Sequence, residues 1–386
     1  MPAAERHRPE DVHSGLPGLR ALPALLRGVS RGRHQRQGLL GRQEAVVVTT
    51  LVTGASGFLG GALVGELLRR REKVRVLARD RAKARDRCGE SVEVVEGDIT
   101  DIHAVRQAVG GATTVYHLAG RLYHPSVPVE LYRHAHVDGT LTLVEACRDQ
   151  TELRRIVHVS TTGVHGVTGG RPASEESPLA PSNPYEATKL AGELLARKFC
   201  RAEGMPLTVV RPGLVYGPGD LHLLGFFASI ERGLFRVIGG GRAWLHPVYI
   251  DDMTAALLLA AERAEAIGRV YNVAGERPVS VRELATAVAR SLGKELPAGS
   301  IPLWLANLAS DVFTVVPGLK GKRAPLTRSR VEFLTSSRIY DIRRAKSELG
   351  YAPRTELEEG IRMTTEWYSR HGFLRGSQRS MAATAQ

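Results

Sequence analysis

Short apolar runs alternate with longer, periodically apolar segments through the first part of the chain. Runs rich in Val, Ile and Thr predict strands at residues 46–53, 73–78, 92–96, 113–118, 155–160 and 207–211. Apolar residues three or four positions apart predict helices between them, including 58–68, 137–147 and 185–202. Strands that alternate with helices are typical of right-handed βαβ units. The pattern therefore predicts an α/β fold with a doubly wound parallel sheet.

The alternation loosens after Pro212, which predicts a smaller C-terminal lobe over the carboxyl edge of the sheet. A helix at 223–233, a short strand at 269–273 and a helix at 281–292, capped by Ser280, are expected there. We expect four parts: a basic N-terminal extension without fixed structure (1–45), a dinucleotide-binding domain (46–240), a substrate-binding lobe (241–375) and a flexible tail (376–386).

A glycine triplet, Gly54, Gly57 and Gly60, joins the first predicted strand to the first predicted helix. Gly54 permits a tight turn, Gly57 lets a pyrophosphate approach the backbone, and Gly60 lets the helix pack closely on the strand. Such a turn is the fingerprint of a Rossmann-type nucleotide-binding domain, although a glycine-rich turn without a ligand is the alternative. The neighbouring residues expected to contact the cofactor are Ser56, Phe58 and Leu59.

The formal net charge of +13 is concentrated in part in residues 1–45, which carry eight arginines against four acidic residues. This segment is either a targeting peptide or a consequence of a start codon placed too far upstream, and we expect it to be dispensable. The chain shows no nucleic-acid-binding module and no apolar run long enough for a membrane span. Three widely spaced cysteines, without metal-ligand spacing, favour a reducing, cytoplasmic compartment.

Tyr185 and Lys189 lie four residues apart at the start of a predicted helix and therefore share one face. A lysine ammonium beside a phenol favours the phenolate and lowers its pKa from about 10, which would make Tyr185 an acid/base group near neutral pH. The predicted fifth strand ends in Ser160, Thr161 and Thr162, whose hydroxyls are positioned to hold a substrate oxygen. We expect His158, within that strand, to be a hydrogen-bonded core residue.

The segments TGASGFLG, VSTTGVHG, NPYEATK and RPGLVYGPGD together resemble the extended short-chain dehydrogenase/reductase superfamily over residues 46–372. The resemblance extends to its NAD-dependent epimerase/dehydratase and 3β-hydroxysteroid dehydrogenase-like members. It implies an NAD(P)-binding Rossmann-type enzyme, which we expect to be a homodimer that acts on a small molecule. No metal site is expected, because Tyr123, His124, His134 and His136 form no recognisable ligand set.

The resemblance also implies roles for individual residues. Tyr185 would be the catalytic acid/base, Lys189 would bind the nicotinamide ribose, and Thr161 would be the catalytic hydroxyl, with Ser160 as the substitute. The further residues expected to contact the cofactor are Asp98, Ile99, Ala119, Gly120 and Pro212. This chain has His136 where the family often has Asn, so either a structural hydrogen bond is retained or the proton path differs. Asp251 and Asp252 are expected to tie the two lobes together.

The end of the second predicted strand suggests which cofactor is preferred. Arg79 follows Ala78 at the position where NAD-specific proteins present a carboxylate to the ribose. A guanidinium suits a 2′-phosphate, so NADP is the preferred cofactor. NAD is the alternative, with Asp80 shifted inward to bind the ribose.

Three functions remain open. The first is a net oxidoreductase for a hydroxyl or ketone of an apolar, steroid-, isoprenoid- or flavonoid-like substrate, with residues 301–316 and 321–334 lining an oily pocket. The second is a nucleotide-sugar epimerase or dehydratase that recycles its NAD in each turnover. The third is a non-catalytic dinucleotide-binding regulator, against which the intact Thr161, Tyr185 and Lys189 set argues.

Overall fold

The computed structural model describes residues 49–315 and 327–374 of the 386-residue chain. The expectations for the 1–45 extension, for the strand start at 46–48 and for the 376–386 tail lie outside these residues. Part of the expected pocket lining, at 316 and 321–326, lies outside them as well.

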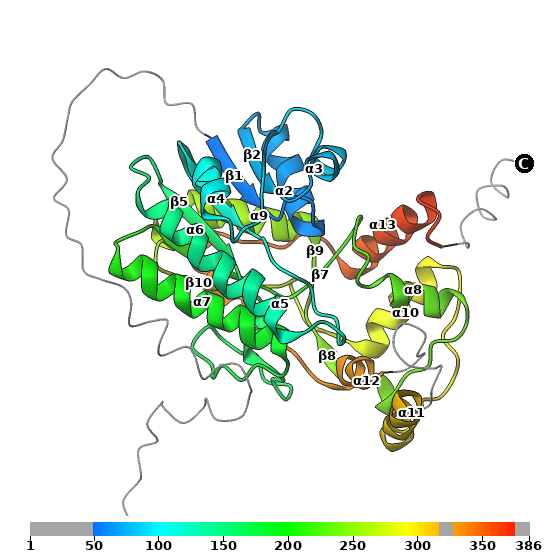
Figure 1. The fold of residues 1–386 in the computed structure, drawn as a ribbon. Helices are drawn as coiled ribbons and strands as arrows, with labels where there is room; N and C mark the ends of the chain where they lie inside the picture. Colours follow the sequence, from blue (N-terminus) through cyan, green and yellow to red (C-terminus); the bar gives the residue numbers. More distant parts are fainter. Residues whose placement is uncertain (1–48, 316–326, 375–386) are drawn as a thin grey trace, which may run out of the picture.

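A seven-stranded sheet, parallel throughout, forms the centre of the protein, with strand order β10-β6-β5-β4-β1-β2-β3 (Figure 1). The strands are β1 (Thr49–Thr53), β2 (Lys73–Ala78), β3 (Glu93–Glu96), β4 (Ala112–His117), β5 (Arg155–Val159), β6 (Leu207–Pro212) and β10 (Val270–Val273). The six predicted strands begin and end within one residue of their predicted limits, except that the predicted start of the first strand lies outside the described residues. The predicted doubly wound α/β fold is confirmed.

Helices cover both faces of the sheet, as buried parallel strands require. The helices α4 (Ile102–Val109), α6 (Gly139–Arg148) and α7 (Pro184–Ala202) share one core cluster with the sheet. The helices α2 (Phe58–Arg69), α3 (Arg81–Cys88) and α9 (Ile250–Glu262) share another, on the opposite face (Figure 1). Helix α7 starts where predicted, with Pro184 in its first turn and the Asn183 side chain accepting the N–H of Glu186 at 3.0 Å.

The helix predicted at 137–147 has a different beginning. A short helix α5 (Val129–Arg133) continues into a π-helical turn, His134–Asp138, and only then into α6. A π-turn accommodates one residue more than an α-helical turn. The sequence periodicity did not reveal this insertion.

A second group of elements packs around its own apolar core at the C-terminal side of the sheet (Figure 1). Its helices are α8 (Leu224–Glu231), α10 (Val281–Ser291), α11 (Leu303–Val315), α12 (Arg328–Thr335) and α13 (Leu357–Arg370). Its short strands form two pairs, β7 (Leu214–Tyr216) with β9 (Pro247–Tyr249) and β8 (Trp244–Leu245) with β11 (Val279–Ser280). Single helical turns occur in both parts of the described chain: η4 (Thr162–His165), η5 (Gly239–Gly241), η6 (Ala264–Ala266) and a π-turn η8 (Ala345–Leu349). Ser280 caps α10 as predicted, accepting the N–H of Glu283.

The two parts interleave along the chain. The strand predicted at 269–273 belongs to the central sheet, where β10 pairs with β6, although it was assigned to the C-terminal lobe. The Asp252 carboxylate in α9 accepts the N–H groups of Arg354 and Thr355, at 2.9 and 3.1 Å. All three residues lie within 241–375, so this contact does not test the expectation that Asp251 and Asp252 tie the two lobes together.

Candidate functional site

The expected site residues gather at one edge of the central sheet. Because β1, β4, β5 and β6 are parallel, their carboxyl ends meet at the same edge. Gly54 follows β1, Ala119 and Gly120 follow β4, Thr161 follows β5, and Pro212 ends β6. Pro212 is buried, and its carbonyl oxygen accepts the hydroxyl of Thr162 at 2.9 Å.

The glycine triplet has the geometry that a dinucleotide requires. Gly54 has a φ of +74°, and a Cβ there would lie 2.7 Å from the backbone of Leu118, so both the turn and the contact with the end of β4 require glycine. A Cβ on Gly60 would lie 2.3 Å from the carbonyl oxygen of Gly54, which prevents any other residue from packing there. Gly57 is exposed immediately before the first turn of α2. Exposed backbone at a helix start suits a pyrophosphate, so these residues fit the cofactor.

Tyr185 contacts Thr161, as the predicted catalytic set requires. The Thr161 hydroxyl lies beside the Tyr185 phenol, and it accepts the N–H of Gly163 at 3.1 Å. Burial raises the pKa of Tyr185 to about 12, and the nearby Glu186 carboxylate raises it too, while the Thr161 hydroxyl offsets only part of the increase. The expected lowering of this pKa by Lys189 is therefore not the net result.

The position of Lys189 accounts for that difference. Its ammonium donates to the carbonyl oxygen of Val159 at 2.5 Å, at the end of β5. Burial lowers the pKa of Lys189 to about 8, and the nearby Glu193 carboxylate offsets part of that lowering. Most of the positive charge is thus kept at pH 7, and it lowers the pKa values of the buried His117, His136 and His158.

His136 is a hydrogen-bonded, neutral residue in this structure. Its Nε2 accepts the backbone N–H of Arg121 at 3.1 Å, which requires Nδ1 to carry the proton. Nδ1 lies 2.9 Å from the hydroxyl of Thr188, which donates in turn to the carbonyl oxygens of Pro184 and Tyr185. Burial, with the Lys189 charge, lowers the pKa of His136 to about 2. Of the two roles left open for His136, the structure supports the structural hydrogen bond.

A second chain of hydrogen bonds, which sequence reasoning missed, runs beneath the site. The Ala119 N–H donates to the hydroxyl of Thr53, which lies 2.9 Å from Nδ1 of His117. Nε2 of His117 lies 3.0 Å from the hydroxyl of Thr140, and that hydroxyl donates to the His136 carbonyl oxygen at 2.6 Å. Because that carbonyl can only accept, His117 donates to Thr140 through Nε2 and accepts from Thr53 through Nδ1. The chain fixes the loop after β4 against the π-turn.

Aromatic rings surround the phenol of Tyr185. His136 and Tyr132 lie edge-on to it, with ring centres 5.5 and 6.1 Å away, and the Tyr123 ring is tilted at 6.5 Å. The Tyr132 hydroxyl accepts the His124 N–H and donates to backbone carbonyls of the same loop. The sequence marked none of these rings for this role, because their proximity depends on the unpredicted helix α5.

The ribose end of the cofactor site carries exposed charges. Arg79 is 73% exposed at the side chain, and its Nε lies 3.9 Å from the Asp98 carboxylate. Asp98 is half-buried and accepts both the N–H and the hydroxyl of Thr100, while Ile99 follows it, packed beside Gly139. Asp80 caps α3 by accepting the N–H of Lys83 at 2.9 Å. One oxygen of its carboxylate is therefore engaged at the start of α3.

His158 departs from expectation. Its ring is buried as predicted, but among the described residues neither ring nitrogen has a hydrogen-bond partner. The His117 ring lies 5.3 Å from it. Burial, with the charge of Lys189, lowers the pKa of His158 well below its usual value. Over the described ranges, no cluster of three His, Cys, Asp or Glu side chains could hold a metal ion.

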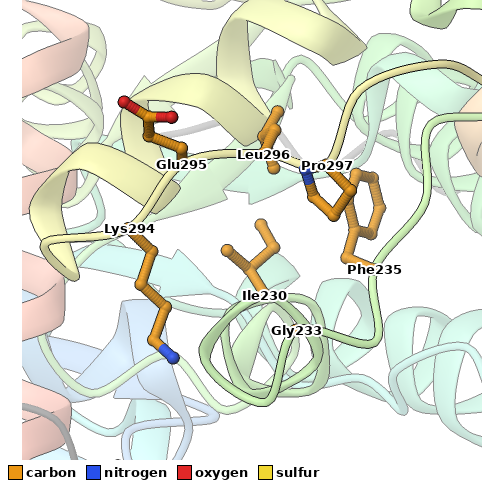
Figure 2. A pocket seen from close by; sticks show the side chains of 7 residues that line it. All are labelled: Ile230, Gly233, Phe235, Lys294, Glu295, Leu296 and Pro297. Atoms are coloured by element: carbon orange, nitrogen blue, oxygen red, sulfur yellow. The ribbon is translucent and has the colours of Figure 1, made fainter.

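A separate hollow of about 270 Å³ lies between α8 and the segment after α10 (Figure 2). Its walls combine the apolar side chains of Ile230, Phe235, Leu296 and Pro297 with Gly233, Lys294 and Glu295. In Figure 2 the charged ends of Lys294 and Glu295 point away from the apolar side chains. The charged ends thus do not converge on the hollow, and the sheet edge remains the candidate active site.

The chain is similar to known proteins over most of its length. Residues 50–274 match the family described as the NAD dependent epimerase/dehydratase family. A ketoreductase of a farnesylated 3-oxo-dihydroquinoline oxide from Stigmatella aurantiaca is 31% identical, over 81% of this chain and 94% of its own. The 2-alkyl-3-oxoalkanoate reductase of Stenotrophomonas maltophilia is 31% identical, over 81% of this chain and 97% of the reductase. A 3β-hydroxysteroid dehydrogenase/decarboxylase of Arabidopsis thaliana is 31% identical over 72% of this chain, which spans only 52% of that protein.

Solved structures share the fold. The crystal structure of gox2253 superposes with a TM-score of 0.70 and 26% identity, over 85% of this chain and 99% of that one. The dTDP-glucose 4,6-dehydratase DesIV of Streptomyces venezuelae, solved with NAD bound, gives a TM-score of 0.68 at 24% identity. The match covers 85% of this chain and 99% of DesIV. At that identity the second likeness shows the fold alone.

Proposed function

Because this chain belongs to the NAD dependent epimerase/dehydratase family of extended short-chain dehydrogenases/reductases, we propose that it is a net oxidoreductase for a ketone or hydroxyl group of an apolar small molecule. The observation that carries the proposal is the placement of the Thr161 hydroxyl beside the Tyr185 phenol, at the sheet edge that also holds the Gly54–Gly60 turn. A non-catalytic regulator would have no need for this pair.

The residues at the sheet edge define the proposed chemistry. The nicotinamide, when bound, supplies or accepts the hydride. Arrival of a hydride at a carbonyl carbon creates an alkoxide, which needs a proton and hydrogen-bond donors. With a pKa of about 12, Tyr185 keeps its proton at neutral pH and can donate it to that oxygen. Thr161 holds the same oxygen, while Lys189 binds the ribose and its charge favours the phenolate that remains.

We propose NADP as the preferred cofactor. The support is local: Arg79 is exposed beside Asp98 at the end of β2, where a 2′-phosphate would lie, and the Asp80 carboxylate is engaged in capping α3. A guanidinium forms charge-assisted hydrogen bonds with a phosphate, whereas a free carboxylate would repel it. Gly54, Gly57, Gly60, Ala119 and Gly120 would form the remaining cofactor contacts through their backbone.

The apolar substrate class rests on the similar reductases, whose names specify a 2-alkyl-3-oxoalkanoate and a farnesylated ketone. The Tyr123, Tyr132 and His136 rings beside Tyr185 provide an apolar wall of the corresponding kind. The expected 46–240 and 241–375 division, the cytoplasmic location and the homodimer stay predictions, and sedimentation velocity tests the last of them.

The decisive experiment follows cofactor oxidation by the purified protein. NADPH and NADH are each offered with a panel of 2-alkyl-3-oxoalkanoates, steroid ketones and small soluble ketones, with Tyr185→Phe as the control. We expect NADPH to be consumed in proportion to the alcohol formed, and no consumption by the variant. Isomerisation of a nucleotide sugar without net change in the cofactor, by protein that retains NAD on purification, would show that the chain is an epimerase instead.

A further inference from the structure

A buried ion pair lies directly beside Tyr185 and joins two distant parts of the chain. Nη1 of Arg338, in the segment that follows α12, donates to Oε1 of Glu186 at 2.8 Å, and Glu186 is the residue after Tyr185 in α7. The Arg338 and Glu186 side chains are 16% and 8% exposed. A buried charge is costly unless a partner compensates it, so each of these two groups depends on the other. The reduction proposed above assigns no role to either residue.

The Glu186 carboxylate contacts both segments that carry the hydroxyl groups of the site. Its Oε2 accepts the backbone N–H of Ser182 at 2.7 Å, just before α7 begins. The same side chain packs on Gly163, where a Cβ would lie 2.9 Å from Cγ and Oε1 of Glu186. The N–H of Gly163 donates in turn to the Thr161 hydroxyl at 3.1 Å. One carboxylate therefore fixes the start of the helix that carries Tyr185 against the turn that holds Thr161.

Arg338 is held by the C-terminal part of the chain. Its backbone N–H donates to the carbonyl oxygen of Trp244 at 2.7 Å, and its Nη2 donates to the Glu332 carboxylate of α12 at 3.3 Å. The two residues beside it in sequence hydrogen-bond with Thr168, in the loop after β5. The ion pair thus connects α12 and the segment after it to the residue next to Tyr185.

The two charges of the pair act on the phenol of Tyr185 in opposite directions. A carboxylate disfavours a nearby phenolate, and the Glu186 charge adds to the effect of burial in raising the pKa of Tyr185. Burial raises the pKa of Glu186 as well, and the Arg338 charge opposes that increase. The other titratable groups around Tyr185 and the pair are Lys189, Tyr123, Tyr132, His136, Glu332 and Tyr340.

We propose that Glu186 and Arg338 are positioning residues for proton transfer by Tyr185. Glu186 fixes the Tyr185 phenol relative to the Thr161 hydroxyl, and Arg338 neutralises the carboxylate that does so. Because Arg338 belongs to the C-terminal part of the chain, the arrangement of the two hydroxyl groups depends on where that part lies. The inference rests on the proposed function, since it takes Tyr185 to be the group that transfers the proton.

Substitution of each member of the pair tests the proposal. Glu186→Gln removes the negative charge, so the Tyr185 phenolate should form at lower pH than in the wild type. Arg338→Met leaves the carboxylate without its partner, so the phenolate should form at higher pH, by about half a unit or more. Its kcat should fall by about tenfold or more, because the phenol is displaced. The double variant should recover most of this loss, since no unpaired charge remains.

Two measurements follow these effects. Stopped-flow pH jumps record the near-ultraviolet absorbance of tyrosinate before alkaline unfolding. The difference from the same protein with Tyr185→Phe reports the phenolate without substrate. The alkaline limb of the pH profile of ketone reduction reports the same group during turnover.

Two further variants separate charge from general disruption. Arg338→Lys keeps the charge, so both midpoints should stay at the wild-type value, with a smaller loss of kcat than in Arg338→Met. Arg344→Met is the matched control, because Arg344 pairs with Glu176 and so links the C-terminal segment to the same loop before α7, in a pair that does not include Glu186. Both midpoints should be unchanged in this control.

The outcomes separate this proposal from the enzymatic one. Midpoints that stay in place in both Glu186→Gln and Arg338→Met, or that move in the same direction, would overturn the positioning role. A double variant no more active than Arg338→Met would overturn it too. If Arg338→Met does not fold, an unmoved midpoint in Glu186→Gln is sufficient to reject the proposal. The expected shifts in a protein that reduces no ketone would support the pair and overturn the proposed function.

Discussion

His136 lies edge-on to Tyr185, with 5.5 Å between the ring centres and 80° between the ring planes. The two residues differ in the proton each can offer. The pKa of His136 is lowered to about 2 by burial, and its Nδ1 proton is held toward Thr188. Tyr185 keeps its proton up to a pKa of about 12, and the Thr161 hydroxyl lies beside its phenol. We therefore propose Tyr185 as the proton donor of the pair, with His136 positioning the loop and the helix around it.

Tyr185→Phe should lower kcat by about 10²–10⁴-fold while NADPH binding stays close to that of the wild type. The reason is that Phe keeps the ring contacts but has no proton to donate. Steady-state kinetics and a cofactor titration measure the two effects. Lys189→Ala should impair both turnover and NADPH binding, because we propose that Lys189 also binds the nicotinamide ribose. A Tyr185→Phe enzyme with most of its turnover would mean that the proton comes from another group.

His136→Leu should lower kcat by roughly ten- to a hundredfold, because the Arg121 N–H and the Thr188 hydroxyl lose their partner and the loop after β4 shifts. The pH dependence of the remaining activity should keep the wild-type midpoints, since His136 does not titrate in the working range. His136→Asn, which retains polar groups, should recover part of the activity. Disappearance of one limb of the pH profile in His136→Leu would instead identify a titrating His136.

Gly60→Ala should destabilise the protein and abolish cofactor binding, because a Cβ would lie 2.3 Å from the carbonyl oxygen of Gly54. Overpacking of this kind typically costs about 1–3 kcal/mol. The matched control is Gly65→Ala in the same helix, where a Cβ meets no atom within 4 Å and Ala is the better helix former. Thermal unfolding with and without NADPH compares them. Equal behaviour of the two variants would contradict the proposed close packing.

Arg79→Ala should weaken NADPH binding by roughly ten- to a hundredfold, the effect of losing a charge-assisted hydrogen bond of about 1.5–3 kcal/mol. NADH binding should be nearly unchanged, since NADH lacks the 2′-phosphate. Arg148→Ala, which removes an exposed arginine at the far end of α6, controls for the general loss of charge. Titration of NADPH and NADH into the wild type and the variant measures the two affinities. Equal losses of affinity for the two cofactors would exclude the proposed role of Arg79.

Acid should destabilise the protein through its buried neutral histidines. The pKa values of His117 and His136 fall to about 3 and about 2, and that of His158 also falls well below 6.5, in each case chiefly because of burial. Below pH 6.5 the unfolded chain therefore binds more protons than the folded one. Stability is present above pH 6.5 and is lost as pH falls toward 3, by about 1.4 kcal/mol per pH unit for each histidine.

His158→Leu should make this acid dependence less steep. At neutral pH the variant should be as stable as the wild type or more stable, because neither His158 nitrogen has a hydrogen-bond partner among the described residues. Denaturant unfolding at a series of pH values measures both effects. A marked loss of stability at neutral pH would show that the ring has a partner after all, such as a buried water.

The sheet and the glycine turn could be predicted from sequence because each depends on neighbours in the chain. Alternation of β-branched runs with helical segments predicts a parallel, doubly wound sheet. Gly54, Gly57 and Gly60 shape a single turn between one strand and the next helix. The surroundings of Tyr185 could not be predicted in the same way. Thr53 and His117 are 64 residues apart, and the pairing of their side chains exists only once β1 and β4 lie side by side.

The electrostatic prediction for Tyr185 was wrong for a related reason. Spacing on a helix places Lys189 on the same face as Tyr185, but it does not show that the ammonium reaches the Val159 carbonyl or that burial outweighs nearby charges. The expectation that α11 lines an oily pocket was wrong for four of its apolar side chains, which are exposed: Leu303, Trp304, Leu305 and Leu308. Their exposure was missed because apolar periodicity reveals an amphipathic helix without showing what its apolar face contacts.

The π-turn at His134–Asp138 makes the number of residues in this segment a property of the active site. An α-helix advances about 100° for each residue, so one residue more or fewer between Tyr132 and Thr140 rotates the preceding side chains by that angle. The helical rod itself would survive such a deletion and would even become more regular. The Tyr132 and His136 rings, however, would turn away from Tyr185, and the Thr140 hydroxyl would lose the His136 carbonyl. Substitutions in this segment can change activity by small steps. An insertion or deletion of one residue moves the whole set of side chains around Tyr185 at once.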